Sequence, residues 1–200
     1  MAELRSFIFI DQLQPQTMCY LATWIKGSLP RLGDSAQIIE IAPGLDIEPL
    51  TDVALKHAAV KAGILVVERQ FGYLEIHGPN DEVRAASDAV LSYLGADPGD
   101  RMAPAILASE TITHIDGQHA FLVNRNRLGS MVLAGESLYV LEMAPASYAI
   151  LATNQAEKAA DIKVVDFRMI GATGRVYLSG AESEIRQAAA AATAALEEVS

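Results

Sequence analysis

Hydrophobic and polar residues follow the same succession of patterns in the two halves of the chain. In the first half, short apolar or alternating runs predict strands at residues 7–11, 37–42, 64–67 and 73–77. Helices are predicted at 52–61 and after Asn80, which we expect to cap its helix. The apolar residues of that helix recur at the helical period: Val83, Ala86, Val90, Leu91 and Leu94. The second half predicts a strand at 111–115 and an alanine-rich helix at 182–199. Each half therefore predicts an α+β domain with helices on an antiparallel sheet.

A gapless internal repeat organises the whole chain. Glu40-Ile41-Ala42-Pro43 is echoed 102 positions later by Glu142-Met143-Ala144-Pro145. The same offset pairs identical residues elsewhere: Gln16 with Gln118, Gly27-Ser28 with Gly129-Ser130, Lys56 with Lys158, Gly72 with Gly174, and Arg84 with Arg186. The sequence therefore predicts two tandem domains, residues 1–98 and 107–200, with a linker at 99–106.

Composition narrows the classes of protein to consider. Of 200 residues, 51% are hydrophobic and 20% charged, with a mean hydropathy of +0.22, so we expect part of the surface to be covered in an oligomer. The net charge of −10 argues against binding to nucleic acid or to an acidic membrane surface. A single cysteine, Cys19, cannot form an internal disulfide, which favours a cytoplasmic location. The chain shows no signal peptide and no apolar run of membrane-spanning length.

No motif in the sequence predicts a catalytic centre, a cofactor or a metal. His114 and His119 lie near Glu110 and Asp116, but a spacing of five residues does not place two ligands on one helix face. The sequence contains no GxSxG elbow, no phosphate-binding GxxxxGK[ST] loop and no GxGxxG fingerprint.

Several segments, in this order, resemble the bacterial microcompartment shell domain. In residues 137–196 the likeness lies in Ala156-Glu157-Lys158-Ala159-Ala160, in the run from Ile170 to Val176, and in the alanine-rich helix after Gly180. A strand precedes each shell-like core, which is the order of the circularly permuted form of the domain. Further segments resemble the tandem, permuted shell proteins of carboxysomes: Leu4-Arg5, Asp11 to Gln16, Thr51 to Lys56, and Val67-Glu68-Arg69. The resemblance covers nearly the whole chain and implies a duplicated, ferredoxin-like shell domain.

The resemblance implies a non-enzymatic homotrimer whose six domains form a pseudohexameric tile with a central pore. Two such trimers stack face to face in some relatives, and tiles pack with other hexameric and pentameric shell proteins. Small metabolites cross the shell through the pore. The expected location is therefore the shell of a cytoplasmic microcompartment, and no cofactor is expected.

The resemblance also places two turns at the pore. The first contains Glu68, Arg69, Gln70, Phe71 and Gly72, and the second contains Ile170, Gly171, Ala172, Thr173 and Gly174. Only the first is charged, so three Glu-Arg pairs per trimer can open or close the pore. The alternative is a solvated turn whose surface ion pair has little effect. Phe71-Gly72 and Thr173-Gly174 are expected to give each turn its small residue or its residue of positive φ.

Lys56 and Lys158 occupy matching positions near the ends of matching helices. In the family, a lysine at this place meets its counterpart on the neighbouring tile, which implies an edge contact. Without the resemblance, the position of each lysine favours a simpler role in stabilising its own helix, since a lysine near a helix C-terminus interacts favourably with the helix dipole.

Two other classes of function are compatible with the sequence. A trimeric sensor or small-molecule-binding protein would hold its ligand in clefts between subunits. An enzyme with an inter-subunit site would use Glu68, Arg69 and a histidine for acid-base catalysis. The enzyme is the weakest hypothesis because no second motif supports it.

Overall fold

The computed structural model describes residues 2–199, which form two compact units. The first unit contains the chain up to Leu13 together with Trp24–Ala103. The second unit contains Gln14–Thr23 together with the chain from Pro104 onward. Helix α1 (Pro15–Leu21) therefore belongs to the first copy by sequence and to the second unit by packing.

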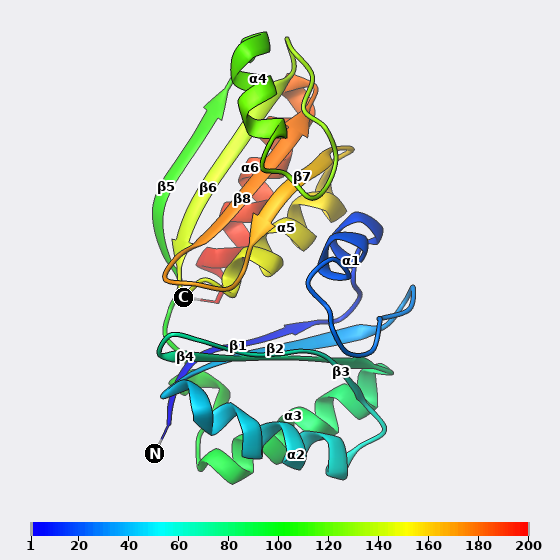
Figure 1. The fold of residues 1–200 in the computed structure, drawn as a ribbon, viewed down its shortest axis with the longest axis vertical. Coiled ribbons are helices and arrows are strands. Elements are labelled where there is room, and N and C mark those ends of the chain that lie inside the picture. The colour runs from blue at the N-terminus through cyan, green and yellow to red at the C-terminus, as the bar shows by residue number, and fades with distance from the viewer. Residues whose placement is uncertain (1, 200) are drawn as a thin grey trace. The chain divides into compact units, whose positions relative to one another are not determined.

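The first unit is a four-stranded antiparallel sheet with two helices on one face (Figure 1). Its strand order is β1-β2-β4-β3. The elements are β1 (Glu3–Ile10), β2 (Ser35–Ala42), the short 3-10 helix η1 (Gly44–Asp46), α2 (Ile47–His57), β3 (Lys61–Glu68), β4 (Phe71–Gly78), α3 (Asn80–Leu94) and the 3-10 helix η2 (Pro98–Asp100). The core lies between the sheet and the two helices.

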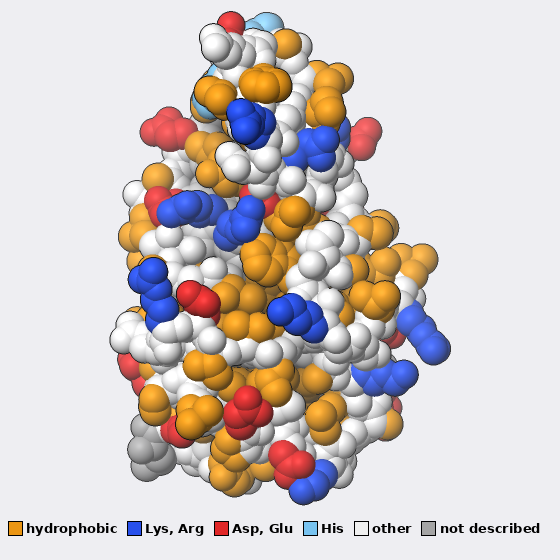
Figure 2. Space-filling view, in the orientation of Figure 1, with side chains coloured by type: hydrophobic (Ala, Val, Ile, Leu, Met, Phe, Trp, Pro, Cys, Tyr) orange, Lys and Arg blue, Asp and Glu red, His pale blue; other side chains and the backbone are white. Residues whose placement is uncertain are grey.

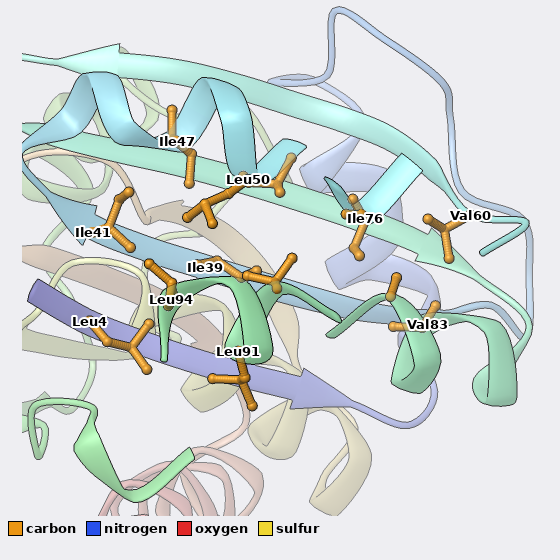
Figure 3. Close-up of a cluster of buried hydrophobic side chains, with 14 residues drawn as sticks. Leu4, Ile39, Ile41, Ile47, Leu50, Val60, Ile76, Val83, Leu91 and Leu94 are labelled. Atoms are coloured by element: carbon orange, nitrogen blue, oxygen red, sulfur yellow. The ribbon is translucent and has the colours of Figure 1, made fainter. Parts of the chain in front are cut away.

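Figure 3 shows how side chains from the strands and helices meet in this core. Ile39 and Ile41 of β2 are two residues apart, so they point to the same face of the sheet. Ile47 and Leu50, three residues apart on α2, pack over them, and Leu91 of α3 closes the layer. Full burial of each such side chain contributes roughly 1.5–3 kcal/mol, so this layer holds the helices on the sheet.

The second unit repeats this architecture, with strand order β5-β6-β8-β7. Its elements are α1, β5 (Ala105–Ile112), α4 (Gly117–Asn124), β6 (Ser137–Ala144), α5 (Tyr148–Ala159), β7 (Lys163–Arg168), β8 (Gly174–Gly180) and α6 (Glu182–Glu197). β2 and β6 coincide residue for residue at an offset of 102, and α3 and α6 start at the same offset. The structure confirms the α+β class, and the two copies share one pattern of elements.

Several predicted boundaries are wrong. The helix predicted at 52–61 spans Ile47–His57, because η1 leads directly into it and Ala58 turns to an extended conformation. The strand predicted at 111–115 is β5, which begins at Ala105, inside the expected linker, and ends at Ile112 before His114 at φ +51°. The alanine-rich helix ends at Glu197.

Asn80 is not the N-cap of α3. Pro79 occupies the capping position, and Asn80 is the first helical residue. The Asn80 side chain instead hydrogen-bonds Asp11 and accepts from Arg84 Nε at 2.9 Å. Its amide therefore joins the start of α3 to the end of β1, which is a different role from satisfying the helix's own N–H groups.

Candidate functional site

The turn between β3 and β4 is a tight hairpin of two residues. Glu68 and Phe71 pair across the strands, which leaves Arg69 and Gln70 as the loop. Arg69 has φ +56°, a left-handed conformation that is unusual for a residue with a Cβ. The side chain of Arg69 is 87% exposed and that of Glu68 50% exposed, and their closest atoms, Nε and Oε1, are 3.9 Å apart. The two charges therefore form a loose pair on an exposed turn.

The base of this turn is held far more tightly than its tip. Arg5 of β1 donates from Nε to Glu40 Oε1 at 2.7 Å, and Glu40 is fully buried. The Arg5 guanidinium also lies 3.9 Å from the centre of the Phe71 ring. A charge-assisted hydrogen bond and a cation–π contact thus fix Phe71 at the start of β4.

The turn between β7 and β8 is longer and carries no charge in residues 169–173. Gly171, the counterpart of Arg69 in the repeat, also has a positive φ, +134°. Thr173 donates its hydroxyl to Glu142 Oε1 at 2.6 Å, and Arg175 Nε donates to the same oxygen at 3.3 Å. Both hydrogen bonds lower the pKa of the Glu142 carboxyl, and the one from the Thr173 hydroxyl has the larger effect. Each copy therefore supports its turn from a glutamate at the same place in the repeat.

Sequence reasoning missed Glu40 and Glu142 as supports of the turns. The sequence does contain a signal for this role, since each glutamate is the first residue of the repeated Glu-x-Ala-Pro segment. A glutamate in an otherwise apolar strand is costly to bury without a partner, so its recurrence indicates a structural partner nearby.

Of the two expected reasons for the turn glycines, positive φ is wrong, because the positive-φ residues of these turns are Arg69 and Gly171. The need for a small residue is confirmed by the backbone next to each glycine. A Cβ built on Gly72 would lie 2.2 Å from the Gly44 carbonyl oxygen. One built on Gly174 would lie 2.3 Å from the Ala146 carbonyl oxygen. Both glycines are required by close backbone approach at the end of the sheet.

The five residues named for the first turn lie together in the β3–β4 hairpin, and the five named for the second lie together between β7 and β8. Lys56 and Lys158 both occupy the last turn of their helices, α2 and α5, and both are exposed. Lys56 Nζ pairs with Asp52 at 2.6 Å within the helix. Asn154 takes the place of Asp52 in the second copy, so Lys158 has a different local environment.

A buried acid–base pair lies on β4, outside the turns. His77 Nδ1 is 2.9 Å from Glu75 Oε1, and both side chains are almost completely buried. Burial raises the pKa of the Glu75 carboxyl, although His77 opposes the shift. Within residues 2–199, no cluster of three or more His, Cys, Asp and Glu side chains could hold a metal ion. Over the same residues, no helix is long and apolar enough to cross a membrane.

The second unit also contains an open cleft of about 640 Å³. It lies between α4 and strands β7 and β8, and its polar lining includes His119, Asp166, Arg168 and Arg175. Burial raises the pKa of Asp166, and the Arg168 guanidinium opposes the shift. Figure 2 shows basic and hydrophobic side chains next to each other on the surface over α4. This cleft is the feature that a small-molecule-binding function would use.

Comparison with known proteins relates the whole chain to shell proteins. The CsoS1D N-terminal domain family matches residues 4–100. The chain is 48% identical over 199 residues to the carboxysome shell protein CcmP of Synechococcus elongatus (strain ATCC 33912 / PCC 7942 / FACHB-805), covering 99% of this chain and 93% of that protein.

Two solved structures match over almost their entire length. A fused permuted hexameric shell protein from the RMM microcompartment is 74% identical, with a TM-score of 0.97 and 98% of each chain covered. A double ringed trimeric shell protein from the same kind of microcompartment is 43% identical, with a TM-score of 0.95, covering 99% of this chain and 97% of that one.

Proposed function

Because the chain belongs to the family of tandem, permuted carboxysome and microcompartment shell proteins, we propose that it forms a shell tile whose pore is gated by the β3–β4 turn. Its role is that of a structural shell protein. Two domains per chain give six domains in a trimer, which agrees with relatives described as hexameric and as trimeric. The observation that supports a gate is the exposed Glu68–Arg69 turn, which is present in one copy only.

The contacts of Arg69 favour a side chain that can change partner. An exposed ion pair at 3.9 Å contributes at most about 1 kcal/mol, so its own Glu68 does not hold Arg69 in place. In a trimer, three such turns would come together at one axis. Like charges repel there, so a closed pore requires each Arg69 to lie between glutamates of adjacent chains.

The rest of the hairpin supports motion confined to the tip. Arg5 and Glu40 fix Phe71, and Gly72 is pressed against the Gly44 carbonyl, so the strands cannot shift without losing these contacts. Rotation of the Arg69 and Glu68 side chains breaks none of these contacts. An open ring lined by arginine would favour anionic metabolites, whereas a ring lined by glutamate would repel them.

The test is a set of structures of the assembled protein. We expect Arg69→Ala to open the pore, and Glu68→Ala to disfavour closure as well, because three arginines would then face one another. Ala172→Ser, in the neutral turn, is the matched control and should leave the pore radius as in the wild type. Residues 68 and 69 on the outer rim of the trimer would refute the gate while leaving the shell function intact.

The same proposal assigns Lys56 and Lys158 to the edge between tiles. Both are exposed at the ends of equivalent helices, so a ring would present them at regular intervals. The partners of such a tile are other hexameric and pentameric shell proteins, and a face-to-face stack of two trimers is part of the proposal. Electron microscopy of the purified protein tests it, since a shell tile forms flat hexagonal arrays.

A second candidate function rests on the 640 Å³ cleft beside α4. A sensor or binding protein would keep this cleft accessible in the assembled protein and would bind a small anion there through Arg168 and Arg175. A shell tile without such a site would show no saturable binding of a small anion. No catalytic role is part of either proposal.

A further inference from the structure

The buried acid–base pair on β4 distinguishes the first unit from the second. His77 Nδ1 lies 2.9 Å from Glu75 Oε1, and the two side chains are 2% and 0% exposed. The far atoms of the pair, Glu75 Oε2 and His77 Nε2, have no hydrogen-bond partner among residues 2–199. At the repeat offset the second unit carries Tyr177 and Ser179, so the carboxyl and the imidazole have no counterpart there.

The strands around the pair surround it with apolar side chains. Residues directly opposite each other in an antiparallel sheet share a face, which places Ile38 and Ile64 beside Glu75. Ala36 is opposite His77 in the same way. This face continues onto β1 through two further apolar residues: Ile8 and Ile10. A charge on the pair would therefore lie in surroundings that solvate it poorly.

Other charged groups around the pair are exposed or have partners of their own. Lys61 of β3 is directly opposite His77, and Lys61 is exposed. Glu40 of β2 lies on the same face but is bound to Arg5 at 2.7 Å. Two more charged residues stand on the segments next to the pair: Lys26 and Asp34. Among residues 2–199, His77 is the one whose charge shifts the pKa of Glu75. The pair therefore depends on its own proton for neutrality.

A short segment after α1 runs along the edge of β3. This segment, residues 25–28, is the strap. Three of its N–H groups donate to carbonyls of β3 at 2.9 to 3.2 Å: Lys26 and Gly27 to Gly63, and Ser28 to Ala62. In Figure 1 the chain between α1 and β2 passes beside β3. Backbone hydrogen bonds therefore hold the strap against the sheet.

Gly63 brings the strap and the pair together. It lies at an irregularity of β3, where the pairing with β4 shifts between Ala62 and Ile64. A Cβ built on Gly63 would lie 2.3 Å from Glu75 Oε2 and 2.9 Å from the Ile25 side chain. The carboxyl and the strap thus meet over this glycine. As long as Ile25 stays in place, it shields the Glu75 carboxyl from water.

The charge of the pair depends on one proton. With that proton on Glu75 Oε1 or on His77 Nδ1, the pair has no net charge. Burial raises the pKa of the Glu75 carboxyl, and His77 together with the N–H groups of Gly63 and Ile64 opposes the rise. Loss of the proton leaves a carboxylate in apolar surroundings, which is costly unless water reaches it. Water reaches it only when Ile25 moves away.

We propose that the Glu75–His77 pair is a pH-sensitive latch for the strap, which closes over the neutral pair and opens when the pair loses its proton. A hydrated, open pair gives up this proton at lower pH than the buried pair does, so a rise in pH favours opening. The pair and the strap lie in one unit, so the latch depends on neither the trimer nor the gate. The loop after the strap, with exposed Leu29 and Leu32, would respond to pH as well.

Hydrogen exchange across a pH series tests the latch, and the second unit supplies an internal reference. Gly129 and Ser130 donate to carbonyls of β7 at 3.0 and 2.8 Å, in the same arrangement as Gly27 and Ser28 on β3. We measure protection factors, which remove the intrinsic effect of pH on exchange, between about pH 5 and pH 9. Protection of the strap should fall by up to about tenfold per pH unit while opening releases one proton. Protection of Gly129 and Ser130 should stay constant.

Two substitutions identify the titrating group. Glu75→Gln keeps the size of the side chain and has no proton to lose, so protection of the strap should no longer change with pH. Lys61→Met removes the exposed cation opposite His77 and is the matched control, which should keep the pH dependence of the wild type. Infrared spectra of the wild type should show the band of a protonated carboxyl that disappears over the same pH interval. This band reports the proton directly even if Glu75→Gln does not fold.

Three results would overturn the latch. The first is strap protection that follows the Gly129 and Ser130 reference at every pH. The second is a pH dependence that persists in Glu75→Gln or is lost in Lys61→Met. The third is a carboxyl band that stays unchanged while the strap opens. None of these results bears on the shell function, because native mass and array formation do not enter the measurements.

Discussion

Removing the Glu157 carboxylate should loosen α1 specifically. Its Oε1 accepts from the Gln16 N–H at 2.7 Å, and its Oε2 accepts from the Thr17 N–H at 2.7 Å and from the Thr17 hydroxyl at 2.8 Å. A helix cap contributes about 1 kcal/mol, and a hydrogen bond to a charged group about 1.5–3 kcal/mol when buried. Because Glu157 is only partly buried, we expect Glu157→Ala to cost about 2 kcal/mol.

Hydrogen exchange measured by mass spectrometry reports this loss of stability at the α1 amides themselves. Two kcal/mol corresponds to roughly 30-fold faster exchange of the α1 amides, if α1 opens without the rest of its unit. The α4 amides, capped by Asp116, serve as the internal reference and should exchange as in the wild type. Glu157→Gln keeps the shape of the side chain and should show a smaller acceleration.

The repeat supplies a rescue for this variant. Gln14 has φ −71° and ψ 151°, close to the φ −60° and ψ 145° of Asp116, so an aspartate at position 14 can cap α1 as Asp116 caps α4. Gln14→Asp added to Glu157→Ala should therefore recover about 1 kcal/mol. Exchange as fast in the double variant as in Glu157→Ala would refute the view that capping is what Glu157 supplies.

Three further predictions follow from the contacts of single residues. Gly72→Ala should lower the free energy of unfolding by about 2 kcal/mol in urea titrations, because its Cβ would meet the Gly44 carbonyl oxygen at 2.2 Å. Burial raises the pKa of Glu75 above 4.5, so its stabilising contribution is present at acid pH and is lost as the pH rises through the raised pKa; the unfolding free energy of Glu75→Gln should depend less on pH there. Lys56→Asp combined with Lys158→Asp should keep the native mass of the wild type but reduce flat arrays in electron micrographs.

The offset of the repeat predicts much of the fold, because buried positions recur in both copies. Val83, Ala86, Val90, Leu91 and Leu94 all lie in the core of the first unit, as the helical period predicts. The turn residues were also grouped correctly within each hairpin. Patterns of apolar residues are sufficient for this because each sheet buries one face against its own helices.

The short helices α1 and α4 were not predicted from the sequence. Each has only seven or eight residues, too few to establish a helical period, and the apolar side chains of α4 do not gather on one face. The local signals are Asp116, an acceptable N-cap before Gly117, and Pro15, which is the first residue of α1. The unit on which α1 packs could not be predicted, since a repeat shows which positions are equivalent but not which copy a helix contacts.

The packing of α1 on the second unit has a consequence for synthesis on the ribosome. The hydrogen bonds of Gln14, Gln16 and Thr17 to that unit span 140 to 148 residues of sequence. At about 5–20 residues per second, α1 emerges roughly 7–30 seconds before its binding surface has been translated. During that interval Tyr20 and Leu21, both buried in the folded chain, have no surface to cover them. A leading chain on the same messenger completes its second unit first, so we expect α1 of a trailing chain to reach that surface more often when ribosomes lie closer together.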